Sequence, residues 1–220
     1  MHFAFEDVLA RLQTALAQPL RGAEAHALMA PRPRRNWPPG FDPAHIRDAA
    51  GLLLVFPIGA AAHIVLTVRA DTLGRHGGQV SLPGGVAEPG ESFERAALRE
   101  AHEEVALAPD HVRVLGALTP LDIPVSGFRL HPIVAAAATR PRLTPADGEV
   151  ALILEVGVDA LWDPARQIST ARIRDGRELT VPAFDVAGVE VWGATAMVLA
   201  EFLTVLGWKP DAAVPTVPPP

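Results

Sequence analysis

Residues 77–105 read GGQVSLPGGVAEPGESFERAALREAHEEV. It contains a short apolar run, a glycine-rich turn and then a segment without Gly or Pro. We predict a helix from Ser92 to Leu107, because Ala, Leu, Glu and Arg favour helices and the Ser92 hydroxyl can cap the first free amides. The last turns of this helix carry three acidic residues close together: Glu100, Glu103 and Glu104.

These three glutamates share one face of the predicted helix, because positions i, i+3 and i+4 are neighbours. Their charges repel unless solvent screens them, cations pair with them or a divalent metal binds them. One interpretation is a solvated acidic face, on which Arg99 pairs with Glu103 and leaves the other two carboxylates free. The other is a magnesium site, since Mg²⁺ prefers oxygen ligands and shares them with substrate phosphates. Gly84 and Gly85, just before the helix, would let the backbone approach such a ligand closely.

The same residues resemble the sequence box of the Nudix hydrolases, G-x5-E-x7-R-E-U-x-E-E-x-G-U, in which U is a bulky aliphatic residue. The matching residues are Gly85, Glu91, Arg99, Glu100, Glu103, Glu104 and Leu107. A chance match to the polar and glycine positions is expected about once in several million starting positions. Two positions depart from the box, Ala101 in place of a larger aliphatic residue and Ala106 in place of Gly. We expect Ala106 to end the helix less sharply than Gly would, without affecting the metal face.

The resemblance implies an α/β fold, a Nudix-type α/β/α sandwich with a mixed β-sheet, and activity with Mg²⁺ or Mn²⁺. It makes Glu100 and Glu104 the leading metal ligands, with Glu103 as a further ligand or an organiser of the others. The backbone carbonyl of Gly84 is implied as an additional ligand. An acid–base pair would hold the loop and the helix together around the metal: Glu91 and Arg99.

Residues 66–85, LTVRADTLGRHGGQVSLPGG, resemble the segment that marks the coenzyme A pyrophosphatase branch of the family, L-T-x-R-S-x3-R-x3-G-Q-V-x-F-P-G-G. The agreeing residues are Leu66, Thr67, Arg69, Gly78, Gln79, Val80, Pro83, Gly84 and Gly85. The departures are Ala70 for Ser, Leu82 for Phe, and Gly74 for Arg, with Arg75 one residue later.

Coenzyme A (CoA) carries a 3′-phosphate as well as the pyrophosphate, and Arg is the natural bidentate partner of such groups. The resemblance therefore implies that Arg69, Arg75 and His76 contact substrate phosphates, together with Gln79 of the same segment. His76 would be a pH-sensitive donor. Arg69 could instead pair with a surface carboxylate.

The implied reaction is hydrolysis of the pyrophosphate bond of CoA or a CoA derivative, which gives 3′,5′-ADP and 4′-phosphopantetheine. Water attacks a phosphorus atom while a carboxylate takes its proton. Either Glu100 or Glu149, which lies in a loop before a predicted strand, could be that base. The predicted catalytic residues are Glu100, Glu103, Glu104, Arg99 and Glu149.

Two other functions stay open at this point. The same class of enzyme could act on ADP-ribose, NADH or a dinucleoside polyphosphate. The chain could also be a nucleotide sensor that has kept the fold without turnover, although a sensor has no need of three aligned carboxylates.

We expect a single domain with appendages in these 220 residues. The expected parts are an N-terminal helix and Pro/Arg-rich connection packing on the core (1–48), the Nudix domain (49–208) and a disordered Pro-rich tail (209–220). Hydrophobic patterns predict helices and strands. Strands are expected at 49–58, 63–70, 79–83, 112–118, 130–138 and 149–156, a hairpin at 167–186, and further helices at 5–16 and 192–207.

Three features could be functional or structural. The arginines of the connection PRPRRNWPPGFDP, residues 31–43, could hold a phosphate or face solvent. Trp192 could stack an adenine or pack against the core. For His131, beside Pro132, we expect a structural role.

The formal net charge of −6 argues against a nucleic-acid partner, and the absence of cysteine excludes disulfides and thiolate sites. No run approaches the ~20 apolar residues of a membrane span, and the N-terminus lacks the apolar core of a signal peptide. We therefore expect a cytoplasmic protein whose partner is a small-molecule nucleotide and neither nucleic acid nor membrane. The oligomeric state is left open, with a homodimer as one option.

Overall fold

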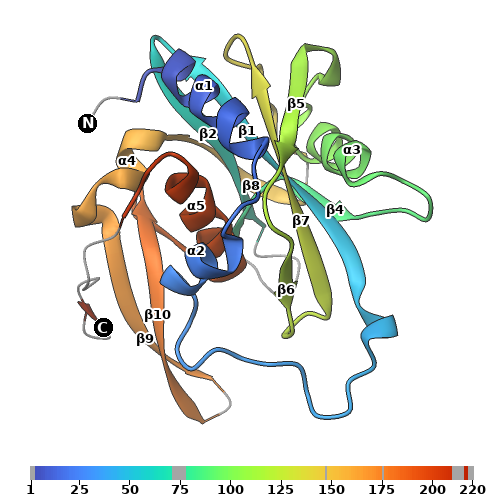
Figure 1. Cartoon of the computed structure of the whole chain (residues 1–220), viewed down its shortest axis with the longest axis vertical. Coiled ribbons are helices and arrows are strands. Elements are labelled where there is room, and N and C mark those ends of the chain that lie inside the picture. Colours follow the sequence, from blue (N-terminus) through green and yellow to red (C-terminus); the bar gives the residue numbers. More distant parts are fainter. Residues whose placement is uncertain (1–2, 71–77, 147, 175, 210–215, 218–220) are drawn as a thin grey trace.

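The computed structural model describes residues 3–70, 78–146, 148–174, 176–209 and 216–217. A large sheet forms the centre of the molecule, a smaller sheet lies beside it, and helices cover both faces of the large sheet (Figure 1). The helices are α1 (Phe5–Leu16), α2 (Gly22–Leu28), α3 (Phe93–Val105), α4 (Val158–Trp162) and α5 (Gly193–Val205). Short 3₁₀ turns lie at Pro43–His45, Pro109–His111 and Pro164–Arg166.

The large sheet is mixed. Its strands are β1 (Arg47–Ile58), β2 (Ala61–Arg69), β3 (Val80–Ser81), β4 (Gly84–Val86), β5 (Val112–Ala117), β6 (Leu121–Ile123), β7 (Phe128–Ala137) and β8 (Val150–Gly157). Their order is β3-β2-β1-β7-β5, with β4 on β1, β6 on β7 and β8 on β2. The central pair β1–β7 is parallel and the other pairs are antiparallel. The predicted α/β fold with a mixed sheet is therefore confirmed.

The centre of β1 is buried on both faces, which explains its uninterrupted apolar run Leu52–Phe56. On one face, α3 packs through Ala96, Ala97 and Ala101, whose small side chains let the helix approach the sheet. Ala101, a departure from the family box, is fully buried in this contact. On the other face, α1 and α5 contribute to a second core.

The smaller sheet covers α5. Its strands are β9 (Gln167–Arg174), β10 (Arg177–Val186), β11 (Val189–Trp192) and β12 (Thr216–Val217). The pair β9–β10 is the predicted hairpin, although Asp175 of its turn lies outside the described residues. In Figure 1, α2 and α5 lie between β10 and the large sheet. Within the tail, the backbone of Thr216–Val217 pairs with β9.

The predicted helices and strands lie within two residues of the observed bounds. Helix α3 confirms its predicted N-cap, since the Ser92 hydroxyl accepts the Arg95 amide at 3.3 Å. Its C-terminus corrects the expectation for Ala106, because the helix ends abruptly there. Ala106 takes the left-handed conformation, φ 54° and ψ 30°, and donates to the His102 carbonyl at 2.9 Å. Alanine tolerates this conformation at a modest cost, so glycine is not required for a sharp end.

The N-terminal segment is anchored to α5 by buried polar groups. His26 of α2 lies 2.9 Å from the Glu201 carboxylate, and both side chains are buried. Glu201 also accepts the hydroxyl of Thr119 at 2.7 Å. A Cβ atom at Gly22 would lie 2.1 Å from Thr119, so α2 approaches this close only because it carries glycine there.

Candidate active site

The glycine-rich turn and α3 are brought together by strand pairing. Gly84 and Gly85 of β4 pair with Gly51 and Ala50 of β1, directly under the helix. A Cβ atom at Gly85 would lie 2.4 Å from the Glu100 carboxylate, so only glycine allows this approach. The turn then reverses before the Ser92 cap, with Gly90 at φ 80°.

Arg99 connects the turn to the helix. Its Nε and Nη2 atoms donate to the two Glu91 oxygens, both at 3.1 Å, and Nη2 also donates to the Val86 carbonyl at 3.1 Å. Its Nη1 atom donates to Glu100 at 2.8 Å and to Glu103 at 3.4 Å. The pairing of Glu91 with Arg99 is thus observed as predicted. The expected pairing of Arg99 with Glu103 is also observed. The expectation that the other two glutamates stay free is wrong, because Arg99 binds Glu100 more closely and the Gly84 amide binds Glu104.

These contacts also fix the charges. Hydrogen bonds from Arg99 and from the Glu88 amide lower the pKa of Glu91. The same carboxylate and Glu100 raise the pKa of Arg99. The bridge between turn and helix is therefore fully ionised across the neutral range.

Glu104 is partly buried, whereas Glu103 is exposed. Burial raises its pKa to about 7, although the Gly84 amide, which donates to Oε2 at 3.1 Å, opposes this shift. The negative charges of Glu100 and Glu149 raise this pKa further, whereas the positive charge of Arg69 lowers it. The charges of Glu100, Glu149 and Arg69, all predicted site residues, thus shift the pKa of Glu104.

The predicted phosphate-binding segment borders this group. The Arg69 amide donates to the Gln79 carbonyl at 3.0 Å, and the Gly78 amide donates to the Arg69 carbonyl at 3.0 Å. The Ala70 amide donates to the Glu149 carbonyl at 3.0 Å, which joins the loop before β8 to the end of β2. Arg75 and His76 lie outside the described residues.

The loop before Glu149 rests on the C-terminus of α3. The Ala146 amide donates to the Glu104 carbonyl at 2.8 Å, and the Thr144 amide donates to the Val105 carbonyl at 3.0 Å. This contact brings Glu149, far away in sequence, to the glutamates of α3.

The donor set suits a hard divalent cation. Glu100, Glu103 and Glu104 supply carboxylate oxygens, and Gly85 leaves room where a side chain would meet Glu100. Within the described residues, no three carboxylates or imidazoles are already gathered around one point. Arg99 and the Gly84 amide hold the glutamates instead, and Mg²⁺ fits such an open set because it keeps several waters and shares substrate oxygens.

Sequence reasoning did not find two backbone groups of the site, the Gly84 amide and the Val86 carbonyl. Both depend on the pairing of β4 with β1, for which three residues of sequence give no signal. His131, expected to be structural, stacks on Phe93 with 3.5 Å between ring centroids and lies 2.7 Å from Asp48.

Comparison with known proteins agrees with this fold and site. The NUDIX domain family matches residues 45–183. A protein of Pectobacterium atrosepticum, "Uncharacterized Nudix hydrolase NudL", is 34% identical over 174 residues, which cover 79% of this chain and 90% of the relative. The protein of the same name from Cronobacter sakazakii is 36% identical over 148 residues, or 67% and 77% of the two chains.

Solved structures give the same result. The M. smegmatis Nudix hydrolase RenU is 25% identical with a TM-score of 0.54, over 73% of this chain and 86% of RenU. A Nudix hydrolase from Nitrosomonas europaea shares the fold at 12% identity and a TM-score of 0.50, over 79% and 80% of the two chains.

Fold, box residues and relatives together define a hydrolase of small-molecule nucleotides, a class that generally uses divalent metal ions. The chain belongs to the Nudix hydrolase family. Across the parts of the chain that the structure describes, no helix has the length and apolar character to cross a membrane.

Proposed function

We propose that this Nudix hydrolase cleaves the pyrophosphate bond of CoA or a CoA derivative, and releases 3′,5′-ADP and 4′-phosphopantetheine or its acyl form. One observation carries the proposal. Arg69 and Gln79, which belong to the segment resembling the CoA branch, are joined by a backbone hydrogen bond, and the Arg69 charge acts on Glu104.

The metal ligands in this proposal are Glu100, Glu103 and Glu104, with the Gly84 carbonyl as an additional ligand, and the metal is Mg²⁺ or Mn²⁺. When bound, such a cation neutralises phosphate charge and lowers the pKa of water. Arg99 and Glu91 keep the turn and the helix at a fixed distance. Arg69, Arg75, His76 and Gln79 bind the substrate phosphates.

In the reaction, a water oxygen bonds to one phosphorus of the pyrophosphate, and the bond from that phosphorus to the bridging oxygen breaks. A carboxylate takes the proton of the water. Glu100 and Glu149 are the two candidate bases near Glu104, and they differ in their contacts and exposure. Arg99 fixes Glu100, whereas Glu149 lies on an exposed loop. A pH–rate profile that loses its acidic limb in Glu149→Gln but keeps it in Glu100→Gln would assign the base to Glu149.

A substrate panel tests the proposal. We expect kcat/KM for CoA or an acyl-CoA to exceed that for ADP-ribose, NADH and a dinucleoside polyphosphate, with Mg²⁺ or Mn²⁺ supplied separately. Faster cleavage of one of the other three would reassign the substrate within the same class. Binding of nucleotides without any product would instead support the sensor.

A further inference from the structure

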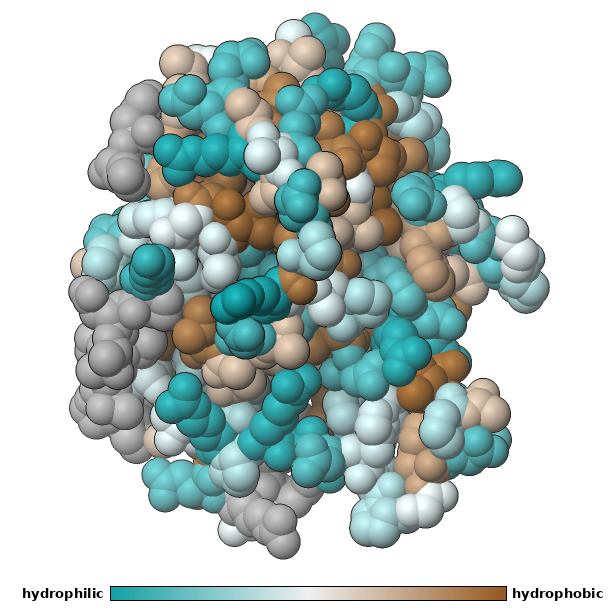
Figure 2. All heavy atoms as spheres, in the orientation of Figure 1, coloured by the Kyte–Doolittle hydropathy of each residue, from teal (hydrophilic) through white to brown (hydrophobic). Residues whose placement is uncertain are grey.

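A cavity of about 680 Å³ lies apart from the glutamates of α3, between the N-terminal connection, β6 and the smaller sheet. The surface of the molecule is hollowed there (Figure 2). Apolar side chains such as Leu121, Val181 and Met197 form much of its wall. The other side chains that line it are polar, charged or aromatic: Arg34, Arg35, Asn36, Asp122, Arg172 and Trp192. This volume is typical of a small-molecule site.

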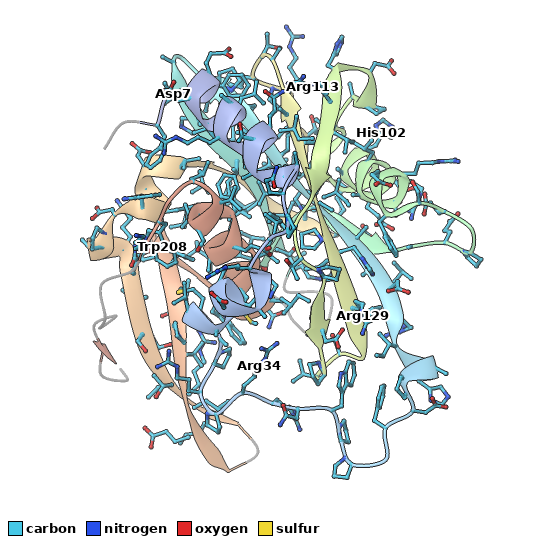
Figure 3. All side chains as sticks on the ribbon, viewed as in Figure 1. Asp7, Arg34, His102, Arg113, Arg129 and Trp208 are labelled. Carbon is cyan, nitrogen blue, oxygen red and sulfur yellow. The ribbon has the colours of Figure 1, made fainter. Side chains whose placement is uncertain are left out.

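The connection, residues 31–43, crosses this cavity and is fixed at both ends, and it is called the strap below. At one end Arg32 exchanges backbone hydrogen bonds with Thr180 of β10, at 2.8 and 2.9 Å. At the other end the Trp37 indole donates to Asp122 of β6 at 3.4 Å. Arg34 lies between these anchors and points toward the space between β10 and β6 (Figure 3). The contacts of the strap with both sheets therefore place the Arg34 guanidinium at the cavity.

The charges at the cavity favour an anion. Asp122 is already bound by Arg129, at 2.7 and 3.3 Å. Arg172 pairs with Glu190 and lies over the Trp192 ring, 4.2 Å from its centroid. The positive charge of Arg34 also contributes to lowering the pKa of Asp122, after the larger effect of the hydrogen bond from Arg129. Because Arg129 makes the hydrogen bonds to Asp122, the guanidinium of Arg34 is left to bind a phosphate beside the apolar wall.

The cavity adjoins the phosphate-binding segment. Gly193 and Ala194 line it, and the hydroxyl of the next residue, Thr195, donates to the Val80 carbonyl at 2.9 Å. Val80 pairs with Val68, the neighbour of Arg69. This hydrogen bond and one strand pairing, which spans about 5 Å, lie between the residues that line the cavity and the strand end that carries Arg69. A substrate with its pyrophosphate at Arg69 can thus extend one nucleoside into the cavity.

We propose that this cavity is the subsite for the phosphorylated adenosine end of the substrate. The purine lies on the apolar wall beside Trp192, where an aromatic ring can stack. The 3′-phosphate binds Arg34, which makes Arg34 the residue that distinguishes CoA from dephospho-CoA. This inference rests on the proposed function, and it assigns the 3′-phosphate to the strap and not to Arg75.

The test is the ratio of kcat/KM for CoA to kcat/KM for dephospho-CoA. We expect Arg34→Ala to lower this ratio roughly ten- to hundredfold, as the loss of a charged hydrogen bond predicts. Arg32→Ala, an exposed arginine of the same strap that does not line the cavity, should leave the ratio unchanged. Trp192→Leu should lower both constants by a similar factor, because both substrates carry adenine. An unchanged ratio in Arg34→Ala, or a ratio lost in Arg75→Ala instead, would overturn the subsite.

A binding measurement separates this inference from the proposed function. Calorimetry without metal should show that the wild type binds adenosine 3′,5′-bisphosphate about tenfold more tightly than 5′-AMP, and that Arg34→Ala removes the difference. If the wild type cleaves neither CoA nor dephospho-CoA, the proposed function fails, yet this difference would still support the subsite. Equal affinities in the wild type would refute the subsite, whatever the enzyme cleaves.

Discussion

At the scale of single residues, Arg99 determines the geometry of the candidate site. Its planar guanidinium is shared by Glu91 and Val86 of the turn and by Glu100 of the helix. A lysine keeps the charge but cannot bind these groups in the same plane, because it has one nitrogen on a flexible stem. The geometry of the carboxylates on α3 thus depends on the Arg99 guanidinium.

We expect Arg99→Lys to lower kcat/KM about 10- to 100-fold, the usual effect of losing a group that orients metal ligands. The far-ultraviolet circular dichroism should stay that of the wild type. Arg95→Lys, an exposed arginine on the same helix, serves as the control and should retain full activity. Full activity of both variants would show that the shared guanidinium does not organise the site.

The pKa of Glu104 predicts how metal binding depends on pH. Burial raises it to about 7, above its ordinary value of 4.5, so between these values the folded metal-free chain keeps a proton that the unfolded chain loses. This contribution to stability is complete below pH 4.5 and is lost as the pH rises through 7. A divalent cation must displace that proton, so its affinity should rise up to about tenfold per pH unit below pH 7 and level off above it.

Titration with Mn²⁺ at pH 6, 7 and 8 measures this dependence. Glu104→Gln should bind Mn²⁺ more weakly, and its affinity should depend much less on pH. Activity should likewise require added metal and rise toward alkaline pH. An affinity of the wild type that is the same at pH 6 and pH 7 would contradict the role of Glu104.

At the scale of elements, composition was sufficient for α3 and most strands of the large sheet, because their apolar and alanine-rich runs report burial directly. The sequence also predicted the Glu91–Arg99 bridge through the resemblance to the family box. It did not predict the β4–β1 register, nor the contact of the loop before Glu149 with α3. Those features join residues distant in sequence, and three-residue strands have no periodicity from which to read them. The sequence did not predict the cavity for the same reason, because its lining residues Arg34, Asp122 and Trp192 come from three separate segments.

Helix α3 ends on a residue that is strained there, and relieving the strain should stabilise the protein. Ala106→Gly removes the Cβ that opposes the left-handed conformation, which should gain about 0.5–1 kcal/mol even though glycine adds freedom to the unfolded chain. For a chain of this size, Tm should rise by roughly 1–4 °C. Ala108→Gly, at φ −74°, should lower Tm and is the matched control. A lower Tm for Ala106→Gly would mean that the end of α3 is not strained.

At the scale of the whole molecule, the N-terminal segment ties the two sheets together. It docks α2 on α5 through His26 and Glu201, pairs Arg32 with β10 and reaches β6 through Trp37. The dock depends on Gly22, where a Cβ would meet both Thr119 and Glu201 within 2.7 Å. Loss of the contact between α2 and α5 should therefore destabilise both α2 and the strap.

Gly22→Ala tests this dock by the sign of its effect. Helix propensity alone predicts stabilisation by up to about 1 kcal/mol. The overpacked contact predicts the opposite, a loss of about 1–3 kcal/mol in the free energy of unfolding. Chemical denaturation measures the difference. Glu24→Ala, exposed on the same helix, should change stability by less than about 0.5 kcal/mol. Stabilisation by Gly22→Ala would show that α2 does not pack as closely as described.

The central claim is that the carboxylates of α3 support metal-dependent cleavage of a CoA pyrophosphate, and mass spectrometry of the products tests it most directly. Wild-type protein with CoA and Mg²⁺ or Mn²⁺ should release 3′,5′-ADP and 4′-phosphopantetheine in equal amounts, and chelation of the metal should stop the reaction. Glu103→Gln and Glu104→Gln should fold normally and lose most of this activity, roughly a hundredfold or more, because an amide is a poor ligand. Glu94→Gln, in the first turn of α3, should keep this activity. Intact CoA after incubation with metal, or the same products after thorough chelation, would contradict the account.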